Sequence, residues 1–574
     1  MRARSWSRGA HEGFLAAALG LAVVGLAGLG GTGCSGTLGD PYGTGDGGSG
    51  AGSGTEPGAQ GIAPRSQFPR LSHAQWERTI VDLFHLDAPT GLSASFTPDP
   101  LGGKAFDNNE AALQVTPGLW ADYQRAAEEV ALLVTSDPAL LEKIAPADLP
   151  ADPAAKKAAF LSSFGKRAFR RPLTDAELTA FSALFDQAPS LDPGADPFTA
   201  GARLSIEAFL QSPFFVYRPE LGISVTGGKV PLSGYEIATR LSYALWGTMP
   251  DDALFSSAEE GKLGSTPGVE EEARRLLADE RARTTLIAFH DQLYDAEQYV
   301  SIQKNTDLYP YFEPILGEDM RTELSLFVEH VLFTQKGGLS DLLTSRTTFV
   351  NGRLAQVYGL DTAGLDDETF VQTELPEAER AGLLTRAGFL SWKGTQTQPD
   401  TILRGVFVNR RILCQELGDP PPAAMGAKLG DEKTDREKVE ALTGKGTCGE
   451  TCHANYINPI GFAFGNYGAL GEYRTTDNGE PVNAADTFPF EEGKVSYDGA
   501  IELSAAVADA EQSHRCYTRY WLEYLYGRDR KTEDGALIAD IAVQSREGAT
   551  VEDIVVALVT SDSFLTRISE EVEP

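Results

Sequence analysis

The sequence predicts a mainly α-helical protein built from several modules. Helix-capping pairs, in which Ser or Thr is followed three residues later by Glu, Gln or Asp, recur before segments whose apolar residues return at helical spacing. A strong hairpin signal occurs near the C-terminus. At 574 residues the chain is too long for one hydrophobic core, so three or more domains are expected. No segment repeats at a fixed period, which argues against a solenoid.

Several helices are expected to begin at recognisable caps. The N-cap residues and their partners are, in chain order, Ser72 with Gln75, Thr116 with Pro117, Thr174 with Glu177, Ser233 with Glu236, and Thr550 with Asp553. Each pairing satisfies a backbone N–H of the first turn, or places proline where its missing N–H costs nothing. Pro172 and Pro250 are expected to end helices, because proline cannot continue the backbone hydrogen bonds.

Longer amphipathic helices are expected in the central and C-terminal parts. Apolar residues recur at helical spacing over about 268–298 and 317–335. Two final helices are expected over about 500–526 and 551–567. Between these ranges a hairpin is expected over 473–488, because Asn478-Gly479 is a strong two-residue turn signal.

The N-terminus has the plan of an export signal. Three arginines among the first eight residues precede an apolar run over 14–29, which is too short to predict a membrane span. Cys34 follows small residues and resembles the lipidated cysteine of a bacterial lipoprotein, although Gly31 stands where Leu is usual. An ordinary cleaved signal is the alternative. We expect an exported protein in the periplasm or at the cell surface, anchored to the outer membrane through lipid on Cys34.

The charge and composition argue against nucleic acid as a partner. The formal net charge is −33, and no basic stripe with interleaved aromatic residues is present, so nucleic acid is not expected. Gly, Ser, Thr and Pro dominate the segment over 34–66, which is expected to be a flexible tether.

Two cysteines and a histidine lie within six residues, at Cys448, Cys452 and His453. In c-type haem attachment, two thiols bond to the porphyrin and the histidine that follows binds the iron. The usual spacing is Cys-x-x-Cys-His, and this segment has one residue more. The extra residue requires a bulge or a later helix start, for which Gly449 gives freedom. Haem c is the first interpretation. His453 would be the proximal ligand of the iron, and Met425 is the first choice for its second axial ligand.

Other interpretations of this segment stay open. Remoter candidates for the second iron ligand, each more simply a packing, core or surface residue, are Met249, His290, His330 and His514. A disulfide between Cys448 and Cys452 would leave His453 as a surface residue, and an oxidising compartment favours it. A zinc site is the third interpretation, but no fourth ligand lies nearby.

The two remaining cysteines, Cys414 and Cys516, lie in apolar segments whose pattern predicts helices. In an oxidising compartment a disulfide between them is favoured over two reactive thiols. It would close a long loop and stabilise the protein by about 4 kcal/mol. The alternative pairs one of them with Cys448 or Cys452, which would exclude haem.

Smaller polar clusters are interpreted structurally. The acidic loop pairs Asp251-Asp252 and Asp477-Asn478 lack the ligand run of a calcium loop and are expected to be solvated turns. The basic cluster Arg167, Arg170 and Arg171 is expected to pair with carboxylates of the same chain.

The chain resembles a family of exported bacterial proteins, common in planctomycetes and myxobacteria, that joins five consecutive domains of unknown function. The matching segments are, in order, Arg70 to Phe84 with Phe106-Asp107-Asn108; Lys166 to Thr174 with Glu177; Ser212 to Arg218, Arg240 to Asp252 and Phe349 to Gly359; Arg404-Gly405 with Cys452-His453 and Pro459 to Ala463; and Tyr524 to Arg528. In this family only the Cys and His segment is similar to cytochrome c. Gly465 and Gly468 stand where members often have acidic residues, which weakens any carboxylate-based reaction there.

The resemblance implies a modular organisation, and the Cys and His segment indicates a redox function. The expected divisions are a signal peptide at 1–33, a tether at 34–66, and modules at 67–137, 138–192, 193–365, 376–490 and 496–570. The module at 376–490 is expected to be a small hairpin-containing cytochrome c-like unit. The first functional hypothesis is a haem c electron-transfer protein with a redox partner protein, or a haem-dependent oxidoreductase. The second is a haem-free structural or binding lipoprotein stapled by the disulfides Cys448–Cys452 and Cys414–Cys516.

Overall fold

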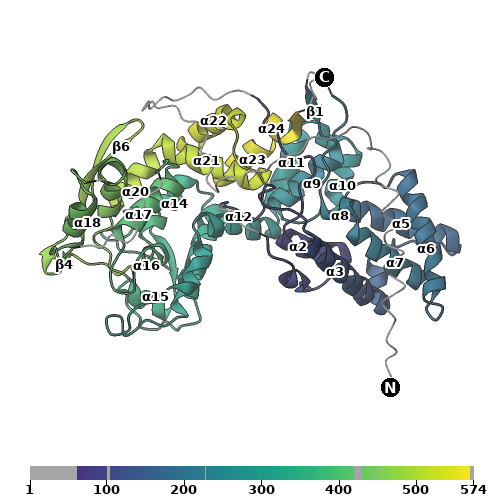
Figure 1. Cartoon of the computed structure of the whole chain (residues 1–574), viewed down its shortest axis with the longest axis horizontal. Helices are drawn as coiled ribbons and strands as arrows, with labels where there is room; N and C mark the ends of the chain where they lie inside the picture. The colour runs from purple at the N-terminus through teal and green to yellow at the C-terminus, as the bar shows by residue number, and fades with distance from the viewer. Residues whose placement is uncertain (1–60, 100–103, 226–227, 419–429, 448, 569–574) are drawn as a thin grey trace, which may run out of the picture. The chain divides into compact units, whose positions relative to one another are not determined.

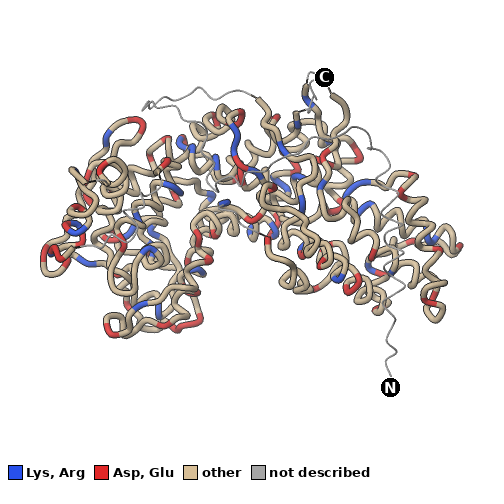
Figure 2. Tube along the Cα trace, in the orientation of Figure 1, with Lys and Arg blue, Asp and Glu red and all other residues tan. Residues whose placement is uncertain are grey.

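The computed structural model describes residues 61–99, 104–225, 228–418, 430–447 and 449–568 (Figure 1). The mainly α prediction is confirmed, because helices dominate these residues and the strands there form small two-stranded sheets. Among the described residues no helix combines the length and the apolar character needed to cross a membrane. Acidic and basic residues are interspersed along the described trace (Figure 2).

The first part of the chain packs short helices around an aromatic core. Its elements are α2 (His73–Phe84), η2 (Leu92–Ser95), α3 (Pro117–Ser136), α4 (Pro138–Lys143), α5 (Pro153–Phe169), α6 (Asp175–Leu191), α7 (Pro197–Gln211), α8 (Pro213–Val216) and β1 (Lys229–Pro231). The capping boxes at Ser72 and Thr174 and the Thr116 cap before Pro117 are confirmed. Helix α5 ends at Phe169, ahead of Pro172, as expected.

The central part contains α9 (Gly234–Leu245), α10 (Asp252–Glu259), η3 (Lys262–Gly264), α11 (Thr266–Leu277), α12 (Glu280–Leu293), η4 (Ala296–Ser301), α13 (Leu316–Glu329), η5 (His330–Thr334), α14 (Leu339–Thr344), β2 (Thr347–Val350), α15 (Gly352–Val357) and β3 (Val371–Glu374). The prediction of one helix over 268–298 is wrong. Asp279 lies between α11 and α12 in extended conformation and its carboxylate accepts from the Arg281 N–H, so it starts a new helix. The helix over 317–335 is confirmed, with η5 as a π-helical end.

The C-terminal part contains η6 (Leu383–Thr385), α16 (Ala387–Trp392), α17 (Thr401–Phe407), η7 (Val408–Ile412), α18 (Asp435–Thr443), η9 (Glu450–Ile457), α19 (Asn458–Phe462), β4 (Thr476–Asp477), β5 (Glu480–Pro481), β6 (Ala485–Phe490), β7 (Gly493–Asp498), α20 (Ala500–Asp509), α21 (Glu511–Tyr526), η10 (Thr532–Asp534), α22 (Gly535–Arg546), α23 (Val551–Val559), α24 (Asp562–Leu565) and β8 (Thr566–Ile568). The turn at Asn478-Gly479 is confirmed, since it joins β4 to β5 and both residues have positive φ, but the predicted extent over 473–488 is wrong because its last residues lie in β6, which pairs with β7.

Two C-terminal predictions need correction. The range 500–526 is broken at Ala510 into α20 and α21, because Ser513 and His514 hydrogen-bond the last carbonyls of α20 and stabilise its end. The range 551–567 holds α23, which begins at the predicted Thr550 cap, then the separate short α24. Helix α22 and the β6–β7 hairpin were not predicted from the sequence.

Within the described ranges, four antiparallel pairs of strands connect near and distant parts of the chain. Strand β1 pairs with β8, in the register Val230 opposite Arg567, and so joins the end of the first part to the C-terminus. Strands β2 and β3 pair with Thr348 opposite Thr373, and β6 pairs with β7 through a tight connection.

Buried apolar side chains gather in two clusters. The first lies among helices α2 to α8 and also takes in Tyr243, Met249 and Phe255. The second extends from α9 to α24 and includes Phe106 from the first part of the chain. Phe106 stacks on Phe289 and meets the edge of Tyr524, so the loop before α3 is packed into the C-terminal core.

Candidate functional site

The Cys and His segment forms a π-helix, η9, that contains Cys452 and His453 and runs directly into α19. A π-helix closes its hydrogen bonds over five residues, one more than an α-helix, and such turns are frequent at functional sites. Here the N–H of Asn458 donates to the carbonyl of His453, five residues earlier. The N–H of His453, by contrast, donates to the carbonyl of Gly449, four residues earlier, at 2.7 Å, so the bulge expected from the extra residue of the motif stays a prediction.

Three predicted site residues lie outside the described residues: Cys34, Met425 and Cys448. Attachment of haem at Cys448, ligation by Met425 and lipidation of Cys34 therefore stay predictions. Cys452 is half-buried and forms no disulfide with any residue that the structure describes.

A tight turn leads into the π-helix. Gly446 has φ of 83°, a conformation that favours glycine, and its N–H donates to the Glu450 carboxylate at 2.8 Å. The Thr447 hydroxyl donates to the Gly444 carbonyl at 2.8 Å and accepts from the Gly449 N–H at 3.1 Å. These bonds fix the chain direction on the N-terminal side of Cys452.

The π-helix and α19 cross α17 with their backbones in contact. A Cβ on Gly405 would collide with the Ile457 carbonyl, and a Cβ on Gly461 would collide with the Thr401 carbonyl. The buried Asn409 amide donates to the carbonyls of Gly405 and Tyr456 at 2.8 and 3.0 Å. Glycine at two crossing points and one buried amide thus hold the segment against α17.

The other sides of the segment are also held. Asn458, which is buried, hydrogen-bonds the Thr443 hydroxyl at the end of α18 at 3.1 Å. Tyr456 meets the ring of Phe488 on β6 edge to face, with ring centroids 6.3 Å apart. Helices α17 and α18 and the unpredicted hairpin β6–β7 therefore position Cys452 and His453.

The imidazole of His453 suits a ligand role. Its Nδ1 atom is buried and has no hydrogen-bond partner among the described residues. Burial lowers the pKa of His453, so the ring is neutral at neutral pH, as a metal ligand must be. The Asn458 side chain lies close enough to the ring to oppose part of this lowering.

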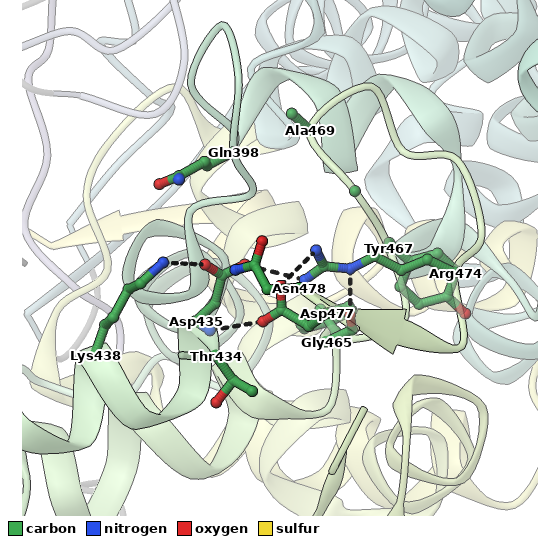
Figure 3. Close-up of polar contacts among 12 residues, drawn as sticks. Gln398, Thr434, Asp435, Lys438, Gly465, Tyr467, Ala469, Arg474, Asp477 and Asn478 are labelled. Carbon is green, nitrogen blue, oxygen red and sulfur yellow. Dashed lines mark hydrogen bonds and ion pairs between the residues drawn. The ribbon is translucent and has the colours of Figure 1, made fainter. Parts of the chain in front are cut away.

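A charged network secures the loop that follows α19 (Figure 3). Arg474 donates to the Gly465 carbonyl at 2.9 Å and pairs with Asp435 and Asp477 at 3.1 and 3.3 Å. Asp477 also accepts from the Asp435 N–H at 2.6 Å, and Lys438 lies 3.5 Å from Asp435. The network joins α18, the β4–β5 hairpin and the loop into one support. Asp477 was expected in a solvated turn, but it is buried here.

Two buried arginines that were not predicted as site residues shape the same loop. Arg404 donates to the carbonyls of Leu390, Tyr467 and Gly468 at 2.7–2.8 Å. Arg380 donates to the Gly471 carbonyl at 2.7 Å. Neither guanidinium pairs with a carboxylate of the described chain. The signals for Arg404 were its place in an otherwise apolar helical segment and the match of Arg404-Gly405 to the family.

A disulfide joins Cys414 to Cys516, as predicted, with their Cα atoms 5.3 Å apart. Cys414 follows η7, and Cys516 lies in α21, so the bond connects the Cys and His region to the C-terminal helices. The alternative pairing of either residue with Cys448 or Cys452 is wrong. Cys448 and Cys452 can therefore bond to haem, to each other or to another partner.

The remoter candidates for the second iron ligand have other roles. His290 and His514 are buried and each hydrogen-bonds through both ring nitrogens. Met249 is packed in the first apolar cluster, and the ring of His330 meets Phe349 edge to face. These contacts fit the core or surface interpretation.

The basic cluster is partly as expected. Arg167 pairs with Asp252 at 2.9 Å and Arg171 pairs with Glu177 at 2.7 Å. Arg170 differs, because it is buried and donates to the carbonyls of Phe214, Phe215 and Tyr217 instead. Within the described ranges no three Cys, His, Asp or Glu side chains gather as a metal site.

Five family models match the chain in consecutive order. Each model describes a protein family of unknown function. The matches are DUF1587 at residues 69–135, DUF1595 at 156–220, DUF1592 at 232–360, DUF1588 at 380–477 and DUF1585 at 493–564. The short name of the fourth model, PSCyt3, hints at a cytochrome-like module, and its range contains Cys452 and His453. The searches found no similar protein of curated function and no similar solved structure.

Proposed function

The chain belongs to a multi-module family of unknown function that joins these five domains in this order, and from that premise we propose that its fourth module attaches haem c and transfers electrons. Cys448 and Cys452 would form the thioethers, and His453 would bind the iron. The observation that carries the proposal is the π-helix at residues 450–457, which contains Cys452 and His453 and overlaps the motif that is one residue too long.

The chemistry of the residues supports the same assignment. Burial favours the neutral form of His453, and Cys452 is not engaged with any described cysteine. A haem would supply reversible one-electron chemistry. The protein's own contribution is to hold the ligands: the glycine contacts fix the helix, and Arg404 and Arg474 fix the loop behind it.

We also propose that the protein works at the cell envelope. A lipid on Cys34 would anchor it to a membrane, with residues 34–66 as a tether, and a redox protein would be its partner. The Cys414–Cys516 disulfide supports export, because structural disulfides persist in oxidising compartments. The expectation that nucleic acid is not a partner rests on the net charge of −33.

Expression of the full chain in a host with export and haem-attachment machinery tests the haem proposal. We expect a Soret band and, after denaturation, a c-type pyridine haemochrome that stays with the polypeptide. Cys452→Ala and His453→Ala should each reduce haem incorporation, whereas His330→Ala should not. A protein without a Soret band and without free thiols would overturn the proposal.

Two further readouts specify the iron site. A reduced spectrum that carbon monoxide leaves unchanged indicates two protein ligands and electron transfer, whereas a shifted spectrum indicates an open iron that can act on a substrate. Met425→Ala should alter the spectrum, and an unaltered spectrum would exclude Met425 as the second ligand.

A haem-free binding lipoprotein is the second candidate. The observation that favours it is the established disulfide, because the same compartment would oxidise Cys448 and Cys452 to a second one. Mass spectrometry of the intact protein separates the candidates, since a disulfide lowers the mass by two hydrogens and haem raises it by the mass of the cofactor.

A further inference from the structure

A buried asparagine, Asn458, lies beside the imidazole of His453. Its backbone N–H donates to the His453 carbonyl, five residues earlier, which is the hydrogen bond of a π-helical turn. In an α-helix, a residue shares its face with the residue four positions further on. The wider turn brings the fifth residue to that side instead, and the Asn458 side chain lies close to the ring, where it opposes part of the fall in pKa that burial causes.

The orientation of the Asn458 amide follows from its hydrogen bonds. The Thr443 hydroxyl has one proton, which it donates to the Val439 carbonyl at 2.7 Å. The same hydroxyl lies 3.1 Å from Asn458 Nδ2 and 3.4 Å from Asn458 Oδ1. Because its proton is already used, the hydroxyl accepts from Nδ2. Asn458 Oδ1 therefore stays an acceptor to which no other described residue donates.

The two ring nitrogens of His453 lie in different surroundings. The side chain is half-buried, and Nδ1 is its buried nitrogen, which makes no well-formed hydrogen bond with a described residue. Nε2 is not buried and also bonds to no described residue, so it is the nitrogen that a ligand can reach. A neutral imidazole carries its proton on one nitrogen and binds a metal through the other. For Nε2 to bind iron, the proton must be on Nδ1.

We infer that Asn458 is a positioning residue that holds His453 as the Nδ1–H tautomer and so presents Nε2 to the haem iron, an inference that rests on the proposed function. Asn458 Oδ1 accepts from Nδ1–H, and Thr443 keeps the amide in this orientation. Histidines that bind metals ordinarily donate their other N–H to a carbonyl or carboxylate, which fixes the ring and strengthens the ligand. The π-helical turn thus has a function, because it places this acceptor beside His453.

Nitrogen-15 NMR of the haem-free full chain, labelled at histidine, tests the tautomer without haem. The signals that His453→Gln removes belong to His453, and they should show a protonated Nδ1. Asn458→Leu removes the acceptor, so the ring should change to the Nε2–H tautomer that histidine prefers in water. Asn455→Leu, at an exposed asparagine of the same π-helix, is the matched control and should leave the tautomer unchanged. An Nε2–H ring in the unaltered protein, or an equal response to both variants, overturns the inference.

The midpoint potential of the haem-loaded protein gives an independent sign. Asn458→Asp provides a charged and stronger acceptor, which makes His453 a stronger donor to the iron and favours the ferric form, so the potential should fall. Asn458→Leu should raise the potential. Each change should alter the ferric-to-ferrous ratio at a fixed potential by about threefold to tenfold. A purely structural role would move the potential of both variants in the same direction, and that result overturns the inference.

A further variant keeps the test decisive where Asn458→Leu fails to fold. Thr443→Val keeps the shape of the side chain but removes the hydroxyl that orients the amide, so the haem-free protein should show a mixture of both His453 tautomers. An unchanged tautomer would overturn the orienting contact. Absence of haem from the unaltered protein would contradict the proposed function alone, because the NMR result is obtained without haem.

Discussion

Glu220 is a buried carboxylate that two arginines from distant parts of the chain neutralise. Its oxygens accept from Arg240 at 2.6 and 2.7 Å, and Arg65 lies 3.2 Å away. Burial alone would raise the pKa of Glu220, but Arg240 and Arg65 together lower it to about 2. The three side chains fasten the first described residues to α9.

Removing this carboxylate should be strongly destabilising. Glu220→Gln leaves two buried guanidinium groups without their counter-ion, so the free energy of unfolding should fall by about 3–5 kcal/mol. Urea unfolding measures the change. Glu377→Gln, at a carboxylate whose side chain is 87% exposed, is the control and should change stability by less than about 0.5 kcal/mol. Equal effects of the two substitutions would contradict the role given to Glu220.

The buried His290 should make stability depend on pH. Its Nδ1–H donates to the Leu286 carbonyl and its Nε2 accepts from the Tyr517 hydroxyl, each at 2.8 Å, so the ring is held neutral. Burial lowers the pKa of His290 to about 4, whereas an unfolded histidine titrates near 6.5. Between these values the unfolded chain takes up a proton that the folded protein does not.

Stability contributed by His290 is therefore complete above about pH 6.5 and is lost as pH falls towards 4. The loss amounts to about 3 kcal/mol for this shift. His290→Gln lacks the titrating group, so the gap in unfolding free energy between the protein and the variant should narrow by about that amount between pH 7 and 4. Urea unfolding at several pH values tests this, and a constant gap would show that His290 is not held neutral.

At the scale of elements, the crossing of α17 with η9 and α19 depends on glycine. Gly405→Ala would place a methyl group against the Ile457 carbonyl and push the π-helix away from α17. We expect a loss of about 1–3 kcal/mol, typical of overpacking, together with weaker haem incorporation if haem is bound. Gly194→Ala is the control, because a Cβ there meets no atom within 4 Å. Thermal unfolding of both variants provides the measurement, and an unchanged Gly405→Ala protein would contradict the close crossing.

Helix starts could be predicted from the sequence because their causes are local. Ser72, Ser233 and Thr550 each cap the helix within three residues, and the pattern is visible in the chain itself. The break at Ala510 could not be predicted in this way. It depends on His514, whose other ring nitrogen contacts Ser545 in a helix further along the chain.

The candidate site, too, could be predicted only where its causes are local in the sequence. Cys452 and His453 could be identified from spacing alone, and the need for a bulge followed from helical geometry. The π-helix that contains these residues is held by Asn409 and by glycine contacts with α17, about 50 residues earlier, so its position depends on the tertiary fold. Hairpin β6–β7 lacks an Asn-Gly or Asp-Gly turn, which explains why it was not predicted.

At the scale of the whole molecule, the Cys414–Cys516 disulfide connects two domains that the family models treat separately. It spans 102 residues between the fourth and fifth modules. Replacing both cysteines by serine should lower the free energy of unfolding by about 4–5 kcal/mol in the chain-entropy model. Urea unfolding under oxidising conditions measures the loss. A variant that unfolds at the same urea concentration as the original protein would show that the two modules are held together by packing alone.

The first and fifth modules are held together by a polar contact between two of the segments that carry the family resemblance. Asp529 accepts from Lys104 at 2.6 Å and from Asn109 at 2.8 Å, while Asn108 donates to the Tyr524 carbonyl at 2.8 Å. The N–H of Glu110 donates to the Gly527 carbonyl at 2.7 Å. Since Phe106 is also packed against Tyr524, the loop before α3 should open only when this contact with the fifth module breaks.

Asp529→Ala tests this dependence. It removes both side-chain bonds to the carboxylate, and because the pair with Lys104 is partly exposed, we expect a loss of only about 1–2 kcal/mol. The clearer result should be local: hydrogen exchange over residues 104–116 should speed up roughly five- to thirtyfold, the ratio that such a loss implies. Exchange over α5 and α6 should not change, because those helices make no contact with Asp529. Asp540→Ala, at an exposed aspartate in α22, is the matched control. Faster exchange throughout the chain would instead mean that the five modules open as one cooperative unit, and unchanged exchange over 104–116 would mean that packing of Phe106 alone holds the loop.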